Sequence, residues 1–99
     1  GLYTAFSAFE QLSNHDIYSK SSEESLSPAQ TFFLAAGQAW CAKREDWLAK
    51  KMLKDDVHAP HSGRVVGIVG NSPEFAKAFN CPNGSKMRPR ADKDLCRAF

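Results

Sequence analysis

The stretch from residue 56 to residue 64 brings together an acid, an imidazole and a guanidinium, and it reads Asp-Val-His-Ala-Pro-His-Ser-Gly-Arg. Pro60 lacks an N–H and biases the preceding residue toward extended geometry, so a helix arriving from upstream should end near Asp56. Residues two apart in an extended segment point the same way, which predicts that Asp56 and His58 lie on one side. A carboxylate beside an imidazole fixes its tautomer and favours its charged form, which is the better hydrogen-bond donor. Arg64 adds a permanently charged planar donor for carbonyl or carboxylate oxygens.

This combination of side chains suits the recognition of a peptide and of negative charge that develops on it. A plainer interpretation is that Asp56 caps a turn and His58 lies on the surface. The spacing of His58 and His61 could also suggest a metal pair. No further ligand of matching spacing accompanies them, so we predict no metal site within the chain.

The elements that must position this stretch are predicted to be mainly helical. Apolar residues recur at helical spacing between Leu2 and Leu12, as on an amphipathic helix. Ser27 supplies an N-cap oxygen and Pro28 a first-turn proline for a helix that should run from Ala29 to about Lys43. A further helix is expected from about Asp46 to Lys54, with acids at its start and lysines toward its end.

The helix predicted over 29–43 is apolar around most of its circumference, which is typical of a helix buried on all sides. The other predicted helices offer too few apolar faces to enclose it, so we expect it to belong to the core of something larger. Residues 65–69 read by composition as a short strand, because valine and isoleucine dominate. Ser72 and Pro73 start another short helix, and the remaining residues, with a turn at Asn83-Gly84, are expected to be irregular.

The composition is that of one small globular domain of 99 residues, 42% hydrophobic and 24% charged. A formal net charge of +2 gives no support for nucleic-acid binding, and the basic tail has no interleaved aromatics. The chain opens on Gly1 without an initiator methionine, which we interpret as the start of a processed product or of a piece of a longer protein. Three cysteines leave at least one without a partner inside the chain, and Cys81 and Cys96 could pair.

Several motifs along the chain resemble those of one family in order and spacing. They are Gly1-Leu2-x-x-Ala5-Phe6-x-Ala8-Phe9, Phe32-Phe33-Leu34 with Gln38-Ala39-Trp40-Cys41, Asp56-Val57-His58-Ala59-Pro60, Arg64-Val65-x-Gly67, Asn71 with Glu74-Phe75, Ala78-Phe79 and Cys81, and the closing Cys96-Arg97-Ala98-Phe99. This set resembles the neprilysin and endothelin-converting-enzyme family of zinc metallopeptidases, with phenylalanine for the family's final tryptophan. The resemblance implies that residues 1–99 are the C-terminal part of the α-rich catalytic domain of a gluzincin-type metallopeptidase, mainly α with irregular loops and little or no sheet.

The resemblance also implies the chemistry of the site. The zinc-ligand segments H-E-x-x-H and E-x-x-x-D are absent from the chain, so zinc would be bound by upstream residues and the fragment alone should be inactive. In the parent, a zinc metalloendopeptidase, His58 would donate to the tetrahedral oxyanion, Asp56 would orient His58, and Arg64 would bind a backbone carbonyl of the peptide substrate. His61 has no role in the family, and we interpret it as a surface residue. The segment between Met87 and Cys96 is a few residues longer than is usual in the family.

The resemblance further implies that Cys41, Cys81 and Cys96 bond to cysteines outside the fragment, which would explain the odd count. Such disulfides imply an extracellular location, either secreted or in the ectodomain of a type II membrane protein. The expected partners are peptide substrates and the missing upstream part of the same polypeptide, with no nucleic acid. The alternative is a non-catalytic peptidase-like remnant or a small secreted binding module.

Overall fold

The structure, a computed structural model, describes residues 1–96 and is helical, with no strand in that range. The prediction of a mainly α fold with irregular loops is confirmed. The elements are α1 (Leu2–Leu12), α2 (Pro28–Gln38), α3 (Asp46–Asp55), α4 (His61–Val69), α5 (Pro73–Ala78) and a single 3-10 turn at Asp92–Asp94. The closing motif that begins at Cys96 lies largely outside the described residues.

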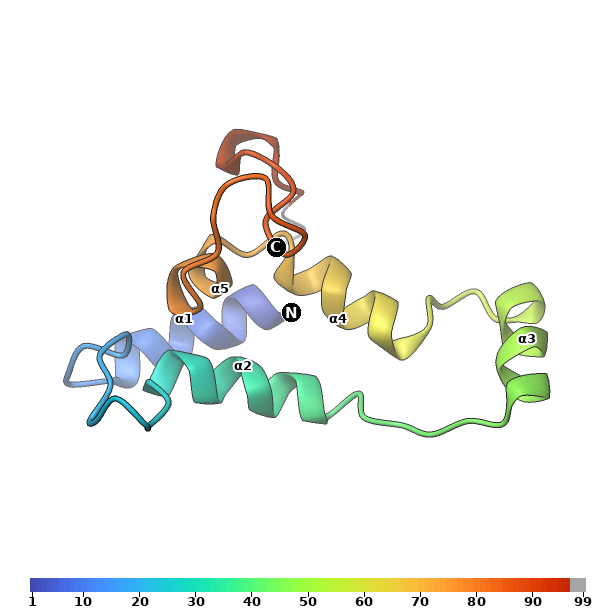
Figure 1. Cartoon of the computed structure of the whole chain (residues 1–99), viewed down its shortest axis with the longest axis horizontal. Coiled ribbons are helices and arrows are strands. Elements are labelled where there is room, and N and C mark those ends of the chain that lie inside the picture. Colours follow the sequence, from blue (N-terminus) through green and yellow to red (C-terminus); the bar gives the residue numbers. More distant parts are fainter. Residues whose placement is uncertain (97–99) are drawn as a thin grey trace.

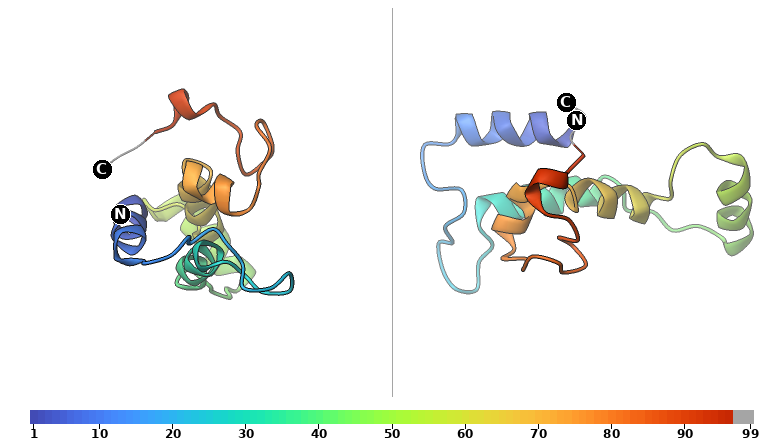
Figure 2. Two further views of the ribbon diagram at one scale, coloured as in Figure 1. Left: turned by 90° about the vertical axis from the view of Figure 1, so that its left-hand side faces the viewer. Right: turned by 90° about the horizontal axis from the view of Figure 1, so that it is seen from above.

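The helices divide into a body, made of α1, α2, α4 and α5, and an arm, made of α3 (Figure 1). In the body, α1, α2, α4 and α5 lie together, whereas α3 stands apart at the end of two connecting segments, residues 39–45 and 56–60. A second direction of view shows the same separation (Figure 2). The arrangement is elongated, with principal extents of 46 × 30 × 24 Å. The start of α4 therefore faces the arm, and residues 56–60 lead from one to the other.

The body is held by a small aromatic core between α1, α2 and α5. Phe6 and Phe33 are buried and stack with ring centroids 5.0 Å apart. Phe32 meets the Phe6 ring edge-on at 5.2 Å, and Phe75 meets the Phe33 ring edge-on at 5.3 Å. These contacts join helices that are distant in the sequence, as edge-to-face and offset aromatic pairs commonly do.

The start of α2 follows the prediction and also ties α2 to α5. The Ser27 hydroxyl accepts from the Gln30 N–H at 3.2 Å, and the Gln30 side-chain oxygen accepts from the Ser27 N–H at 3.0 Å. This reciprocal pair is a capping box. The amide nitrogen of Gln30 then donates to the carbonyl of Ala78 at 2.9 Å. One buried glutamine thus satisfies the helix start and links it to α5.

Two secondary-structure predictions are wrong, one in the type of an element and one in a helix end. The segment 65–69, expected to be a strand, is the second half of α4. Its apolar side chains Val65, Ile68 and Val69 follow a helical i, i+3, i+4 spacing and line one apolar cleft of about 330 Å³. Helix α2 ends at Gln38 rather than near Lys43, because i→i+3 turn bonds follow it and the carbonyl of Trp40 is used by a side chain of α4.

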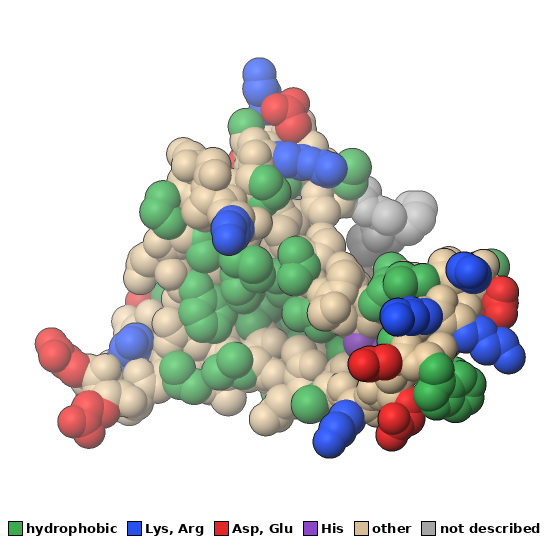
Figure 3. Space-filling model, turned by 45° about the vertical axis from the view of Figure 1, so that its right-hand side comes forward, with side chains coloured by type: hydrophobic (Ala, Val, Ile, Leu, Met, Phe, Trp, Pro, Cys, Tyr) green, Lys and Arg blue, Asp and Glu red, His purple; other side chains and the backbone are tan. Residues whose placement is uncertain are grey.

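Apolar surface remains exposed on both the body and the arm (Figure 3). Leu34 on α2 is 48% exposed, and α3 buries no residue, with Trp47 65% and Leu53 68% exposed. The exposure of Leu34 agrees with the expectation that α2 packs within a larger assembly. In residues 1–96 there is no helix of the length and apolarity that a bilayer crossing requires.

Candidate functional site

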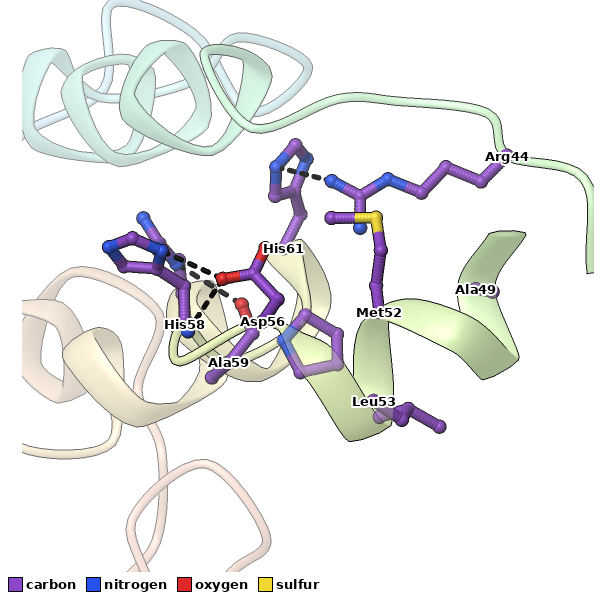
Figure 4. A pocket seen from close by; sticks show the side chains of 10 residues that line it. Arg44, Ala49, Met52, Leu53, Asp56, His58, Ala59 and His61 are labelled. Carbon is purple, nitrogen blue, oxygen red and sulfur yellow. Dashed lines mark hydrogen bonds and ion pairs between the residues drawn. The ribbon is translucent and has the colours of Figure 1, made fainter. Parts of the chain in front are cut away.

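The three side chains that the sequence analysis placed in the catalytic and substrate-binding site, Asp56, His58 and Arg64, line one cleft between the arm and the start of α4 (Figure 4). The cleft has a volume of about 250 Å³. Its walls come from the connector after α2, from α3, from the loop 56–60 and from the first turn of α4. The lining residues are Arg44, Ala49, Met52, Leu53, Asp56, His58, Ala59, Pro60, His61 and Arg64.

Asp56 and His58 form the pair that the sequence predicted. Helix α3 ends at Asp55, and Asp56 is its extended C-cap residue. The Asp56 Oδ1 atom accepts two hydrogen bonds from His58, one from the backbone N–H at 2.8 Å and one from Nδ1 at 2.9 Å. The predicted helix end and the shared side are both confirmed. Asp56 therefore caps the turn and holds the imidazole with the same oxygen.

These hydrogen bonds settle the charge and proton arrangement of the pair. The two bonds from His58, first the backbone one and then the side-chain one, hold the pKa of the Asp56 carboxyl below its usual value of 3.8. Asp56 is therefore ionised at neutral pH, and an ionised carboxylate can only accept. His58 must then carry its proton on Nδ1, which leaves Nε2 as the ring nitrogen available to a ligand. The His58 side chain is 65% exposed and that of Asp56 is 29% exposed.

Arg64 lies in the first turn of α4 and is held from two sides. Its Nε donates to the carbonyl of Ala59 at 3.1 Å, and its Cζ lies 4.8 Å from the centroid of the Trp40 ring. A guanidinium over an indole face at this distance is a cation–π contact. Within residues 1–96 the terminal nitrogens of Arg64 have no hydrogen-bond partner. They are free to donate to a ligand in the cleft.

His61, which we predicted to be a surface residue, is half-buried and fully engaged, so that interpretation is wrong. Its Nδ1 lies 3.0 Å from the carbonyl oxygen of Trp40, and its Nε2 lies 3.0 Å from Nη2 of Arg44. Its ring also meets the Trp40 ring edge-on at 5.4 Å. The one sequence signal for this role was the i, i+3 spacing of His61 and Arg64, which places both on one helix face.

Residues 1–96 do not fit a metal centre of their own. No three histidine, cysteine or acidic side chains come together in that range. His58 uses Nδ1 on Asp56, and both ring nitrogens of His61 are engaged. The three cysteines are free thiols, with Cys41 and Cys96 exposed and Cys81 half-buried, so the Cys81–Cys96 pair that the residues alone allowed is not formed.

Comparison with known proteins identifies the family. The model of peptidase family M13 matches residues 1–95 of the chain. The chain belongs to peptidase family M13. The resemblance to neprilysin-type enzymes that the motifs predicted is thereby confirmed, and the helical structure agrees with it.

Relatives within this family are similar over different shares of the chain. Neprilysin-2 of Drosophila melanogaster is 47% identical over 62 residues, which is 63% of this chain and 8% of that protein. Membrane metallo-endopeptidase-like 1 of Mus musculus is 44% identical over 64 residues, 65% of this chain and 8% of that protein. Neprilysin of Homo sapiens is 36% identical over 105 aligned positions, covering all of this chain and 13% of that protein. The chain thus spans about a tenth of the length of these relatives, and no solved structure matches it.

Proposed function

We propose that this chain is the C-terminal segment of a longer family M13 peptidase, the parent peptidase, which cleaves peptides as a zinc metalloendopeptidase. In this proposal the cleft between α3 and α4 is one wall of the active site. The observation that carries the proposal is the Asp56–His58 pair, 2.9 Å apart, in the same cleft as an arginine with unused donors.

His58 is proposed to stabilise the negative charge that forms on the scissile carbonyl oxygen. When water adds to a peptide carbonyl, the carbonyl π electrons move onto oxygen, and a donor already aimed at that oxygen lowers the barrier. His58 would donate from Nε2 as an imidazolium, because Nδ1–H is committed to Asp56. The ionised Asp56 supports that charged form and fixes the orientation of the ring.

Arg64 is proposed to bind the substrate before the reaction. Its Nε bond to Ala59 and its stacking on Trp40 restrain the guanidinium, while its terminal nitrogens can donate to a backbone carbonyl of the peptide. This contact exists in the ground state as well as in the transition state. It contributes to KM, whereas the His58 contact contributes mainly to kcat.

Zinc is proposed as the cofactor of the parent peptidase and would be held by residues outside this chain, because residues 1–96 gather no ligand set. Zinc supplies Lewis-acid activation of water or of a carbonyl. Cys41, Cys81 and Cys96 are proposed to form disulfides with cysteines elsewhere in the parent, in an extracellular setting. The proposed partners are peptide substrates and the remainder of the same polypeptide.

Steady-state kinetics of the full-length parent peptidase on a fluorogenic peptide test this function. His58→Ala should lower kcat by about 10²–10³-fold with KM nearly unchanged, the size typical of losing one oxyanion donor. His15→Ala is a matched control, because His15 is an exposed histidine in the loop before α2. A His58→Ala enzyme with near-full kcat, or a parent without peptidase activity, would overturn the proposal in favour of a surface turn.

A further inference from the structure

Trp40 contacts two side chains of α4, and this arrangement suggests how Arg64 is kept in place. His61 and Arg64 are three residues apart on the helix and so share one face. The guanidinium of Arg64 covers the Trp40 ring at 4.8 Å, and the ring of His61 meets the same indole edge-on at 5.4 Å. The orientation of the indole therefore depends on His61 and in turn limits where Arg64 can lie.

The hydrogen bonds of His61 anchor the segment that carries Trp40. A carbonyl oxygen only accepts and a guanidinium only donates, so the contacts with Trp40 and Arg44 require a neutral ring that is protonated on Nδ1. The ring then donates from Nδ1 to the Trp40 carbonyl and accepts from Arg44 at Nε2. Residues 40 and 44, which lie in the connector between α2 and α3, are both fixed to the first residue of α4.

We propose that His61 is a positioning residue for Arg64, acting through Trp40, and that Arg44 completes the junction. This inference rests on the proposed substrate-binding role of Arg64. Without His61, the connector loses both anchors and the indole loses its edge contact, so the guanidinium samples more positions. The cost falls on substrate binding, because Arg64 makes its contact before the reaction.

A double-mutant cycle in the full-length parent peptidase tests this inference. His61→Ala should raise KM by about 3- to 10-fold, the size of one or two lost hydrogen bonds, while kcat changes much less. In an Arg64→Ala background the same change should alter KM by less than about 2-fold, because residues that act through one another are not additive. His61→Gln, which keeps one donor and one acceptor, should restore most of the KM.

Separate outcomes distinguish this inference from the proposed function. If Arg64→Ala leaves KM unchanged, the substrate role of Arg64 fails and this inference fails with it. If Arg64→Ala raises KM but His61→Ala does not, or if the two effects add, only the positioning role is wrong. Arg44→Met removes the donor to Nε2 without altering α4, and it should reproduce part of the KM effect even if His61→Ala folds poorly. His15→Ala again serves as the control.

A different feature, the turn after α5, supports a second and independent inference. Asn83-Gly84-Ser85 is an N-x-S acceptor sequence for N-glycosylation. The Ser85 N–H donates to the Pro82 carbonyl at 3.1 Å, and Gly84 has a φ of +81°, which together describe a type II-like turn. Asn83 is exposed at the tip of this turn and has no hydrogen-bond partner within residues 1–96. Its amide is open to a bulky substituent.

We infer that Asn83 carries an N-linked glycan in the secretory pathway, which rests on the proposed extracellular setting. The side-chain amide nitrogen of Asn83 would bond to C1 of a lipid-diphosphate-linked oligosaccharide. The C1–O bond to the diphosphate breaks, the lipid diphosphate leaves with the electron pair, and the transferring enzyme takes the amide proton. The turn lies in the body, apart from α3 (Figure 1), so the glycan would leave the cleft open.

Mass spectrometry of the peptide containing residue 83, from parent peptidase secreted by eukaryotic cells, tests this site. The wild-type peptide should carry hexose and N-acetylhexosamine mass that peptide N-glycosidase removes. Asn83→Gln and Ser85→Ala should abolish it. Ser85→Ala removes no hydrogen bond, because the buried Ser85 hydroxyl has no hydrogen-bond partner. Asn80→Gln, outside the acceptor sequence, should retain it. A secreted, active parent that lacks the glycan would refute the glycosylation site at Asn83 but leave the proposed function intact. A parent that never enters the secretory pathway would refute the glycosylation site as well.

Discussion

Asp56→Asn in the parent peptidase separates the two tasks that one oxygen performs. Asp56 Oδ1 accepts from both the backbone N–H and Nδ1 of His58, at 2.8 and 2.9 Å. Asparagine keeps a neutral acceptor for the backbone N–H, so the turn should persist. It removes the charge that supports an imidazolium, and hydrogen bonds to a charged acceptor are about twice as strong as neutral ones. We therefore expect kcat to fall by about 5- to 20-fold, with KM little changed.

A comparison with Asp56→Ala separates the orienting role of Asp56 from its role as a turn cap. Alanine removes the turn bond as well as the charge, so it should reduce kcat by more than asparagine does. Asp55→Asn is a matched control, since Asp55 is the exposed last residue of α3 and does not line the cleft. Steady-state kinetics across a pH series, with melting temperatures for each variant, provide the assay. If Asp56→Asn keeps full kcat while Asp56→Ala loses it, Asp56 is only a turn cap and the orienting role is refuted.

Three further predictions follow from the contacts in the cleft and from the exposed apolar surface. Arg64→Ala in the parent should raise KM by about 10- to 100-fold, since it would remove the charged hydrogen bonds proposed to reach the substrate. An unchanged KM in steady-state assays would contradict this. The pKa of the Asp56 carboxyl is lowered in the folded protein, so its contribution to the free energy of unfolding should be complete above pH 3.8 and lost as the pH falls through the folded-state pKa. Carboxyl NMR of a segmentally labelled parent measures this pKa, and a value at or above 3.8 would disagree. The isolated 99-residue chain should bind a hydrophobic dye and no stoichiometric zinc, which dye fluorescence and calorimetry measure. A monomer with a sharp melting transition and no dye binding would argue against this prediction.

The features that sequence predicted well are those fixed by local chemistry. Ser27 before Pro28 marks a helix start whatever surrounds it, and the proline at position 60 forces the preceding helix to stop near Asp56. The Asp56–His58 pair needs only a two-residue spacing in extended backbone. The part of the site made by neighbouring residues was therefore predictable from composition and order.

The features that sequence predicted poorly depend on contacts between distant residues. The β-branched residues of 65–69 favour a strand by propensity, but Val65 and Val69 lie one helical turn apart and face the body, which favours a helix instead. Beyond the early end of α2, the carbonyl of Trp40 contacts His61, which is 21 residues away in the sequence. The same contact underlies the proposed positioning role of His61, for which the i, i+3 spacing with Arg64 is the one local sequence signal.

The transition-state role proposed for His58 can be tested directly with a tetrahedral inhibitor. A peptide phosphonate carries an anionic oxygen where the oxyanion would form, so its affinity should follow transition-state stabilisation and not substrate binding. If His58 donates to that oxyanion, His58→Ala should raise the inhibition constant of the phosphonate by the same factor, about 10²–10³, by which it lowers kcat/KM, while KM stays nearly constant. An inhibition constant unchanged by His58→Ala would contradict the account.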